Sequence, residues 1–366
     1  MKILITGGHL SPALSVISQL KGEEILYVGR KYALEGDTAY SFEYQIINGL
    51  GIPFFSITTG RLQRKFTRYT FLSLLKLPLG FFQSITVLKS FKPDVILGFG
   101  SYVSVPVIIA GFLFRIPVVI HEQTLEAGMA NKIARYFATK ICISWPSSRK
   151  FFPENKTVFT GNPLRKEILE VLKTEKKDLP LIFVTGGSLG SHFINELVKG
   201  SIETLIENFE VIHQTGDAKQ FNDFEKLEKI KSGLGEDGKR YTVKKFLTPT
   251  ESARYLKIAD IVVGRAGINT VTELMFLRKP SLLIPLVFSQ NNEQYKNAQI
   301  LKSEGIGEIL EEKNANPQSF IAEITAIFKN ISAYRKNGKK TNHLINKNAS
   351  AKIAEVVRKI YEEKKS

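Results

Sequence analysis

The sequence predicts an α/β protein made of two Rossmann-like domains, each built on a parallel sheet. Short apolar runs alternate with helical patterns along the whole chain, and such alternation is typical of parallel sheets wrapped by helices. A chain of 366 residues is longer than a single hydrophobic core usually supports, which favours two domains. The two halves also resemble each other, because residues 3–8 and 182–187 each place an apolar run before Thr-Gly-Gly.

The expected strands are short buried runs rich in Ile, Leu and Val. They cover residues 2–5, 24–29, 94–99, 117–122 and 140–144 in the first half and residues 181–187, 209–216, 260–267 and 280–286 in the second. Helical patterns between them include residues 191–209 and 269–278. Residues 160–180 join the halves and end in a Lys/Glu-rich stretch that suits an exposed connector. We therefore expect domains at residues 1–162 and 163–344, with a ligand cleft at the carboxyl ends of their strands.

Composition is that of an ordinary globular protein, with 43% hydrophobic and 23% charged residues. No apolar run reaches the roughly 18 residues of a membrane span, and the N-terminal run is too short for a signal peptide. The single cysteine, Cys142, excludes an internal disulfide and a cysteine metal cluster and is interpreted as a buried small hydrophobe. These features predict a cytosolic protein.

The net charge of +16 indicates an anionic partner, such as nucleic acid, an anionic membrane or a phosphorylated substrate. Much of the excess lies in residues 60–82 and 334–366. Neither segment resembles an RNP motif, a zinc finger or a helix-turn-helix reader, so no nucleic-acid partner is expected.

A glycine turn in residues 185–197 connects a predicted strand to a predicted helix. Its three glycines permit positive φ and close backbone approach, and Ser188 adds a hydroxyl, so exposed N–H groups and the helix dipole would form an anion site. A plain strand-to-helix turn explains the same glycines. The segment is not GxGxxG, nor are residues 98–103, which removes the main support for a nicotinamide enzyme.

Residues 264–280 also run from a strand into a helix, with a turn at Gly267. The helix is expected to begin near Asn269 or Thr270 and to carry Glu273 in its first turn. One interpretation makes Glu273 the acid of a capping box with Thr270. The other makes it a carboxylate at a strand's carboxyl end that accepts hydrogen bonds from two ribose hydroxyls.

Three further polar segments follow predicted strands. Arg165, at the presumed hinge, is either a surface charge or a bidentate ligand of a diphosphate. Residues 121–132 hold three polar side chains in a row, and the amide-rich residues 289–298 suit recognition of sugar hydroxyls. Their regular placement at strand ends indicates a common ligand site.

Metal-dependent chemistry is not expected, since the chain has no Asp-x-Asp and its five histidines are not paired at ligand spacing. The charge of a leaving diphosphate would be met by Arg165, backbone N–H groups and helix N-termini. No GxxxxGK[ST] is present either. This combination favours transfer from a nucleotide sugar over kinase chemistry, with no cofactor.

Residues 61–82 combine apolar and basic residues at helical spacing. The apolar positions include Leu72, Leu75, Leu79 and Phe82, and the cations around them are Arg61, Arg64, Lys65, Arg68 and Lys76. Pro78 is expected to break or start a helix within the run. The segment is either a core helix with basic flanks or a patch that dips its apolar groups into a bilayer while its cations meet anionic lipid.

With these residues in view, the chain resembles the MurG family, the UDP-N-acetylglucosamine–N-acetylmuramyl-(pentapeptide)-pyrophosphoryl-undecaprenol N-acetylglucosamine transferases of bacterial peptidoglycan synthesis. The resemblance rests on the order and spacing of motifs along nearly the whole chain. They are TGGH..PAL (6–14), KPDVILGFGSYVSVPVIIAG (92–111), HEQ....G..NK (121–132), GNPLR (161–165), GGSLGS..IN (186–195), HQTG (213–216), RAGINTVTEL (265–274) and EQYKNAQIL (293–301). The resemblance implies a GT-B fold, a C-terminal helix at about residues 345–366 that returns to the first domain, no metal, and inversion at the anomeric centre.

The resemblance also implies roles for individual residues. UDP-GlcNAc would lie on the second domain, and the first would dock on the cytoplasmic face of the membrane to reach a polyprenyl-diphosphate acceptor, lipid I. His9 would be the general base for the acceptor hydroxyl, because a neutral imidazole with a pKa near 6.5 suits that role at cellular pH. The expected substrate-binding residues are Thr6, Gly7 and Gly8 in the first turn, Thr124 at the sugar, Arg165 and Ser188 at the diphosphate, Leu247 at the uracil, Ile268, Asn269, Thr270, Val271 and Thr272 along the nucleotide, Glu273 at the ribose, and Gln294 at the GlcNAc hydroxyls.

Some positions depart from the family's pattern. The family's first turn usually reads GGxGGH, whereas here the apolar run leads directly into TGGH. Thr124 replaces an amide side chain and Leu189 replaces a Gln, while Glu293 stands where a His or Gln usually precedes Gln294. The donor nucleotide motifs are therefore mostly kept, and the acceptor-facing turn and part of the sugar shell are altered.

We therefore expect an inverting, metal-independent transferase that moves GlcNAc from UDP-GlcNAc to the muramyl 4-hydroxyl of lipid I and gives lipid II. A UDP-GlcNAc epimerase of the same fold is one alternative, and it would need no acceptor. The others are a glycosyltransferase acting on another lipid acceptor and a partner subunit that has lost catalysis.

Overall fold

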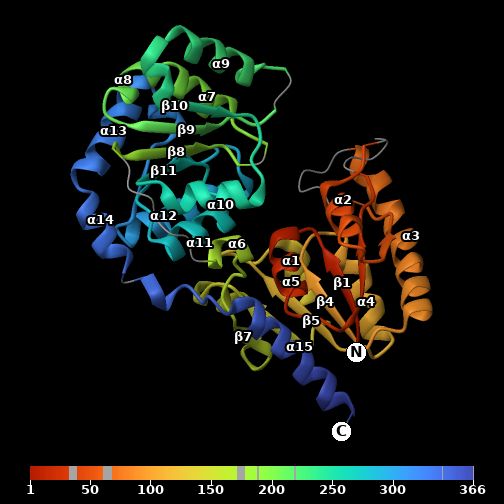
Figure 1. Cartoon of the computed structure of the whole chain (residues 1–366). Helices are drawn as coiled ribbons and strands as arrows, with labels where there is room; N and C mark the ends of the chain where they lie inside the picture. Colours follow the sequence, from red (N-terminus) through yellow and green to blue (C-terminus); the bar gives the residue numbers. More distant parts are fainter. Residues whose placement is uncertain are drawn as a thin grey trace. The chain divides into compact units, whose positions relative to one another are not determined.

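A parallel β-sheet forms the centre of each of two α/β units in the computed structural model (Figure 1). The first unit comprises residues 1–165 and 346–366, and the second comprises residues 166–345. The structure describes residues 1–32, 39–60, 68–170, 178–187, 189–217, 220–339 and 341–365. The predicted α/β class, with two Rossmann-like parallel-sheet domains, is confirmed.

The sheet of the first unit has the strand order β3-β2-β1-β4-β5-β6-β7, and all its pairings are parallel. Its strands are β1 (Lys2–Gly7), β2 (Glu24–Gly29), β3 (Phe54–Ser56), β4 (Val95–Phe99), β5 (Val118–Glu122), β6 (Lys140–Ile143) and β7 (Thr157–Phe159). Thr6 of β1 lies opposite Val28 of β2 and Gly98 of β4. The carboxyl ends of these three strands therefore meet at one edge of the sheet.

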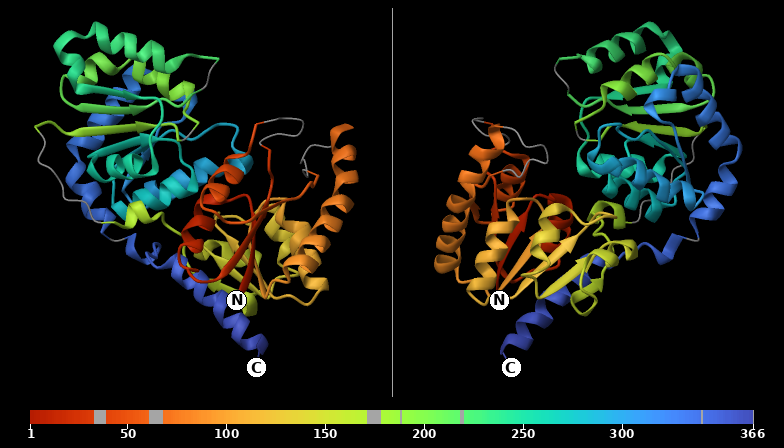
Figure 2. Two further views of the ribbon diagram at one scale, coloured as in Figure 1. Left: turned by 45° about the vertical axis from the view of Figure 1, so that its right-hand side comes forward. Right: turned by 180° about the vertical axis from the view of Figure 1, so that it is seen from behind.

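Helices cover both faces of this sheet. They are α1 (Leu10–Ile17), α2 (Phe42–Gly49), α3 (Arg68–Phe91), α4 (Ser104–Leu113), α5 (Met129–Ala134), the short 3-10 helices η1 (Pro146–Phe151) and η2 (Glu154–Lys156), and α15 (Ala349–Lys365). Side chains alternate between the faces of a strand, so Ile3 and Ile5 pack with α1 and α15 while Leu4 packs with α3 and α4. The C-terminal helix returns to the first unit as expected, and Figure 2 shows it (blue) alongside that unit from two sides.

The second unit has the strand order β10-β9-β8-β11-β12-β13, again parallel throughout. Its strands are β8 (Leu181–Thr185), β9 (Glu210–Gln214), β10 (Tyr241–Lys244), β11 (Ile261–Gly264), β12 (Ser281–Leu283) and β13 (Gly307–Ile309). Its helices are α6 (Lys166–Leu169), α7 (His192–Lys199), α8 (Ile202–Ile206), α9 (Asp223–Gly233), η3 (Gly235–Arg240), α10 (Pro249–Ile258), α11 (Ile268–Leu277), η4 (Gln290–Asn292), α12 (Glu293–Ser303), η5 (Glu312–Asn314), α13 (Pro317–Lys329), α14 (Ile331–Gly338) and η6 (Thr341–His343). A core of Ile, Leu, Val and Phe from β8, β9, β11, α7 and α13 holds these layers together.

All nine expected strands are present, and the four that the sequence did not predict are short edge or near-edge strands. β3, β7, β10 and β13 have three or four residues each, too few for an apolar period to stand out. The helix expected over residues 191–209 is divided into α7 and α8, because α7 ends at Gly200. Cys142 is buried in β6 as predicted, and burial raises the pKa of its thiol to about 12.

The expectation that Pro78 breaks or starts a helix is wrong. α3 runs without interruption from Arg68 to Phe91 with Pro78 inside it. A proline costs the helix one backbone hydrogen bond, and packing of the following turns against the core, through Val87 and Leu88, keeps the helix continuous. No helix in the described part of the chain has the length and apolar character needed to span a bilayer.

Candidate active site

The turn after β1 is packed tightly on the turn after β4. Gly7 has φ +137°, and a Cβ there would lie 2.7 Å from the carbonyl carbon of Phe99, so only glycine fits. The N–H of Gly8 donates to the carbonyl of Gly100 at 3.3 Å. Thr6 is fully buried. The first turn therefore presents fewer groups to a ligand than expected, because the Gly8 N–H is already hydrogen-bonded to Gly100 and the Thr6 side chain is buried.

His9 follows this turn and occupies the N-cap position of α1. Its imidazole lies beside Gly100, where an added Cβ would come within 3.2 Å of the ring. The Nδ1 atom is buried without a hydrogen-bond partner among the described residues. Burial lowers the pKa of His9 below 6.5, and the carboxylate of Glu122 partly offsets that effect. His9 is consequently a neutral imidazole at cellular pH, the form that accepts a proton.

The Glu122 carboxylate holds together the loop that leads from β5 to α5. It accepts hydrogen bonds from the Thr124 N–H at 3.0 Å, the Thr124 hydroxyl at 2.6 Å, the Gly128 N–H at 2.9 Å and Nδ2 of Asn131 at 3.0 Å. The Thr124 hydroxyl thus forms its hydrogen bond within the loop, although Thr124 was expected to contact the sugar. Its contact with the sugar stays a prediction.

His121 is the neighbouring imidazole, fully buried in β5. Its Nε2 lies 2.9 Å from the Ser144 hydroxyl, and its ring packs edge-on against Phe99 with centroids 5.6 Å apart. Burial, and then the nearby His9, lower its pKa to about 3. His121 is therefore neutral at cellular pH, and it becomes protonated only in strong acid.

The glycine turn of the second unit is also closely packed. Gly190 has φ +76°, and a Cβ there would lie 1.9 Å from the carbonyl oxygen of Thr215. The Gly187 N–H donates to the Thr185 hydroxyl at 3.0 Å, and that hydroxyl donates to Gln214 at 2.9 Å. Ser188, the expected diphosphate ligand, lies outside the described residues. Arg165, the other expected ligand, is partly buried and ends the N-terminal segment of the first unit, residues 1–165.

Arg265 is an important residue of this unit that the sequence did not single out. Its Nε and Nη2 donate to the Ser191 hydroxyl at 3.1 and 2.8 Å, and its Nη1 donates to the Ile284 carbonyl at 3.0 Å. The same Nη1 lies 2.6 Å from the Glu312 carboxylate, and the side chain is only 13% exposed. Arg265 therefore ties the end of β11 to the start of α7, the end of β12 and η5. The sequence motif that contains Arg265 was recognised, but the residues that Arg265 contacts are distant in sequence.

The helix α11 begins one or two residues earlier than expected, which changes the interpretation of Glu273. Gly267 is the N-cap, no side chain caps the helix, and the first turn holds no acidic residue. The capping box of Thr270 with Glu273 is therefore wrong, because Glu273 falls in the second turn. Glu273 is nonetheless 94% buried, since its exposed fraction is 6%, and a buried carboxylate on a helix beside a strand end is suited to bind hydroxyl groups.

The residues expected along the nucleotide divide into two groups. Ile268, Val271 and Thr272 are buried, with exposed fractions of 5%, 0% and 1%, so their side chains belong to the core. Asn269 and Thr270 are partly exposed on the first turn. Asn269 and Thr270 are therefore the residues of this group whose side chains could contact a nucleotide. The three buried residues act indirectly, by packing that positions the N-terminus of α11.

Leu247 lies in the loop after β10, and Gln294 lies in the first turn of α12, which follows β12. Within the described chain, the backbone N–H and carbonyl of Leu247 make no hydrogen bond to the protein, as a uracil contact requires. Gln294 accepts the Leu286 N–H through Oε1 at 3.0 Å, so part of its amide orders the loop. Asn297 on the same helix donates to the Ala266 carbonyl at 3.0 Å and joins α12 to the turn before α11.

A cluster that the sequence did not predict joins α7 to α9. Nδ1 of His192 lies 2.9 Å from the buried Asp223 carboxylate, which also accepts Nδ2 of Asn195 at 2.7 Å. Glu196 brings a second carboxylate within 4.8 Å of the His192 and Asp223 ligand atoms. Because Asp223 is already bonded to two partners, we interpret the cluster as a link between the two helices.

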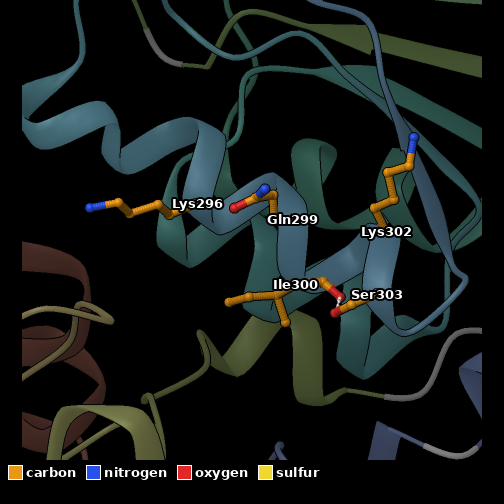
Figure 3. Close-up of a pocket in the computed structure, with 5 residues that line it drawn as sticks. All are labelled: Lys296, Gln299, Ile300, Lys302 and Ser303. Carbon is orange, nitrogen blue, oxygen red and sulfur yellow. Dashed lines mark hydrogen bonds between the residues drawn. The ribbon is translucent and has the colours of Figure 1, made fainter.

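A surface hollow of about 490 Å³ runs along α12 (Figure 3). It is lined by Lys296, Gln299, Ile300, Lys302 and Ser303. Lys302 pairs with Glu308 at 3.2 Å, and the Ser303 hydroxyl donates to the Ile300 carbonyl at 2.9 Å. None of the expected site residues borders this hollow, so it is separate from the candidate site.

Two family models match the chain. Residues 6–143 match the glycosyltransferase family 28 N-terminal domain, and residues 181–357 match the glycosyltransferase family 28 C-terminal domain. A protein of Clostridium botulinum strain Hall is 34% identical over 98% of this chain and 99% of its own length, and is named UDP-N-acetylglucosamine–N-acetylmuramyl-(pentapeptide) pyrophosphoryl-undecaprenol N-acetylglucosamine transferase. A protein of Lachnospira eligens with the same name is 34% identical over 93% of this chain and 94% of its own.

Solved structures show the same fold. The crystal structure of Acinetobacter baumannii MurG has a TM-score of 0.73 at 24% identity and covers 98% of this chain and 99% of that chain. The UDP-GlcNAc 2-epimerase of Neisseria meningitidis, bound to UDP-GlcNAc, has a TM-score of 0.67 at 15% identity and covers 98% of this chain and 100% of that chain. Transferases and epimerases therefore share this architecture, and the fold alone does not distinguish them.

Proposed function

The chain belongs to the MurG family of N-acetylglucosamine transferases within glycosyltransferase family 28, and we propose from this membership that it transfers GlcNAc from UDP-GlcNAc to the muramyl 4-hydroxyl of lipid I, giving lipid II. The observation that carries the proposal is the 34% identity to a transferase of that name over 98% of the chain. The reaction belongs to peptidoglycan synthesis.

For the donor, we assign UDP-GlcNAc to the second unit. The buried Glu273 carboxylate would accept the ribose hydroxyls, and the unbonded backbone of Leu247 would meet the uracil. The N-terminus of α11, with Asn269 and Thr270 on its first turn, favours the negative charge of the diphosphate. Arg165 and Ser188 remain the proposed diphosphate ligands, and the amide of Gln294 the proposed sugar ligand.

For the chemical step, the neutral His9 would accept the proton of the muramyl 4-hydroxyl. The hydroxyl oxygen then forms a bond to the anomeric carbon as the bond from that carbon to the UDP oxygen breaks on the opposite face, which inverts the configuration. Charge that develops on the leaving UDP is met by fixed dipoles and cations. Lowering of the His9 pKa by burial supports the assignment, because the base must be unprotonated before it acts.

For localisation, we propose that the first unit docks on the cytoplasmic face of the membrane. Leu79 and Phe82 in α3 are 48% and 65% exposed, and Phe112 and Leu113 at the end of α4, which packs against α3, are 50% and 62% exposed. Exposed apolar side chains near cations are typical of surfaces that enter the interface of an anionic bilayer. Residues 61–67 and the side chains of residues 68–77, which include Leu72 and Leu75, lie outside the described part.

The deciding experiment supplies UDP-GlcNAc with and without lipid I and follows both UDP release and the disaccharide lipid product. Formation of lipid II only when both substrates are present supports the transferase. Conversion of UDP-GlcNAc to an epimer without lipid would favour the epimerase instead, and donor binding without any product would indicate a non-catalytic subunit. Glu273→Ala tests the donor assignment separately, because it should remove UDP-GlcNAc binding measured by calorimetry.

A further inference from the structure

Residues 213–216, the motif HQTG, run from the end of β9 into the loop that follows it. β9 lies next to β8 in the sheet, and β8 leads into the glycine turn of the second unit, which begins at Gly186. Motif and turn are in backbone contact, because Gly216 has φ +75° and a Cβ there would lie 2.4 Å from the carbonyl oxygen of Leu189. With no side chain between them, a displacement of the motif is transmitted directly to the turn.

The buried Asn195 of α7 fixes this contact. Its Nδ2 donates to the Thr215 carbonyl at 3.1 Å and to the Asp223 carboxylate at 2.7 Å. The same Thr215 oxygen is the atom that would lie 1.9 Å from a Cβ on Gly190, the glycine at the end of the turn. The hydrogen bond from Asn195 therefore holds the Thr215 carbonyl in its position against the glycine turn.

His213 orients the Asn195 amide. Because both acceptors lie on the Nδ2 side of that amide, its Oδ1 accepts Nε2–H of His213, at 3.0 Å. Nδ1 of His213 accepts the Tyr241 hydroxyl at 3.0 Å. His213 is fully buried, and burial lowers its pKa to about 3, so the neutral ring keeps this tautomer at cellular pH. A flipped amide would turn its NH2 toward the His213 N–H, so His213 selects one orientation of Asn195.

Gln214 contacts the same turn by a second route. Its Oε1 accepts the Thr185 hydroxyl at 2.9 Å, and Oγ1 of Thr185 accepts the Gly187 N–H at 3.0 Å. Gln214 and Thr185 are both buried, so water competes little for these hydrogen bonds. Two adjacent residues of β9 thus hold the glycine turn at both ends, Gln214 through Gly187 and His213 through Gly190.

We infer that His213 and Gln214 are positioning residues for the diphosphate of the sugar-nucleotide donor, and that they act by fixing the glycine turn that binds it. The inference rests on the proposed function, since Ser188, the proposed diphosphate ligand, belongs to this turn. Hydrogen bonds to a charged group are strong, and they weaken steeply when distance and angle change. The nucleoside part of the donor, assigned to Leu247 and Glu273, should not depend on the turn.

The test measures the dissociation constants of UDP and of uridine for the wild type, His213→Leu and His213→Gln. His213→Leu removes the donor to Asn195, so the Kd for UDP should rise by about 5- to 20-fold, a part of the 10- to 100-fold cost of losing a hydrogen bond to a charged group. Uridine has no phosphate and should bind the wild type and His213→Leu equally. A glutamine can place an N–H near the position of Nε2, so His213→Gln should recover most of the affinity for UDP.

Tyr241→Phe is the matched control, because it removes a buried hydrogen bond from the other side of the same imidazole and leaves the bond to Asn195 in place. It should lower the Tm without a measurable change in the Kd for UDP. Equal weakening of UDP binding in Tyr241→Phe and His213→Leu would reflect general loosening of the fold and overturn the inference. Equal losses of UDP and uridine binding in His213→Leu would overturn it as well.

Gln214→Leu tests the second route and decides the case if His213→Leu does not fold. It removes the acceptor of the Thr185 hydroxyl, so it should weaken binding of UDP but not of uridine. Unchanged UDP affinity in the folded variants would overturn the inference. Absence of UDP binding to the wild type would instead refute the donor assignment of the proposed function, so the two failures are distinguishable.

Discussion

Nδ2 of Asn131 lies 3.0 Å from Oε2 of Glu122, and this hydrogen bond joins the end of β5 to the first turn of α5. The same amide nitrogen donates to the His121 carbonyl at 3.1 Å. The Glu122 carboxylate raises the pKa of His9 against the lowering caused by burial. One buried carboxylate therefore shapes the loop and also sets the basicity of the proposed base.

Replacing Glu122 with Gln should move the titration of His9 to lower pH. Without the negative charge, burial lowers the pKa of His9 further, so the acidic limb of the pH profile of kcat/KM should shift to lower pH. Turnover should also fall, because an amide NH2 in place of Oε2 can accept neither the hydrogen bond from Gly128 nor the one from Asn131. Glu154→Gln, at a carboxylate that is 89% exposed, serves as control, and an identical pH profile for the two variants would contradict the coupling.

Replacing His9 with Ala should reduce kcat by about 10²- to 10⁴-fold, the range that general bases contribute. UDP-GlcNAc binding, measured by calorimetry, should not change, since His9 and the proposed donor site belong to different units. In the wild type, the rate should fall only as the pH drops below 6.5 and His9 becomes protonated. Near-normal turnover of His9→Ala would remove it as the base.

Stability should decrease in acid because of two buried histidines. Burial lowers the pKa of His121 and of His213 to about 3. The folded state therefore binds fewer protons than the unfolded chain, so stability is full above pH 6.5 and is lost as the pH falls toward 3. Each histidine contributes a slope of about 1.4 kcal/mol per pH unit in that window. Urea unfolding at several pH values measures this slope.

His213→Gln is the specific test of that slope. Oδ1 of Asn195 accepts Nε2–H of His213, because Nδ2 of Asn195 already donates to Thr215 and Asp223. Nδ1 then accepts the Tyr241 hydroxyl at 3.0 Å, and protonation would destroy this bond. In His213→Gln, the slope of unfolding free energy against pH should decrease by the contribution of one histidine. His343→Gln, at an exposed histidine, should keep the full slope.

Replacing Arg265 with Lys should destabilise the second unit by about 2 kcal/mol or more, since a buried fork with several partners is lost. A lysine offers one nitrogen to Ser191, Ile284 and Glu312, which lie in different directions from the guanidinium. Arg335→Lys is the control, because Arg335 is 53% exposed and pairs with Asp260, and such pairs are worth about 0 to 1 kcal/mol. Equal changes in Tm for the two variants would refute the structural role of Arg265.

The sequence was sufficient for nine of the thirteen strands in the described chain and for the glycine turns, but not for the side-chain partners. Apolar runs ending in glycine located β1 and β8, because the strand period and the glycine conformations are local properties. The Arg265 contacts to Ser191 and Glu312 join residues 74 and 47 positions apart, and no local pattern encodes such a distance. Glu273 failed as a capping acid for a related reason, since the start of α11 at Ile268 depends on Gly267 and on packing of the first turn.

Membrane binding should depend on the exposed apolar residues of α3. Leu79→Ser with Phe82→Ser removes two side chains that are 48% and 65% exposed, so binding to anionic vesicles should weaken because less apolar area enters the bilayer. The activity on a short-chain, water-soluble acceptor should stay near that of the wild type, since neither residue is among those assigned to the proposed site. Phe288→Ser in the second unit removes a side chain that is 93% exposed and should leave vesicle binding unchanged. If Phe288→Ser weakens sedimentation with vesicles as much as the α3 variant, general surface hydrophobicity and not the α3 surface accounts for membrane binding.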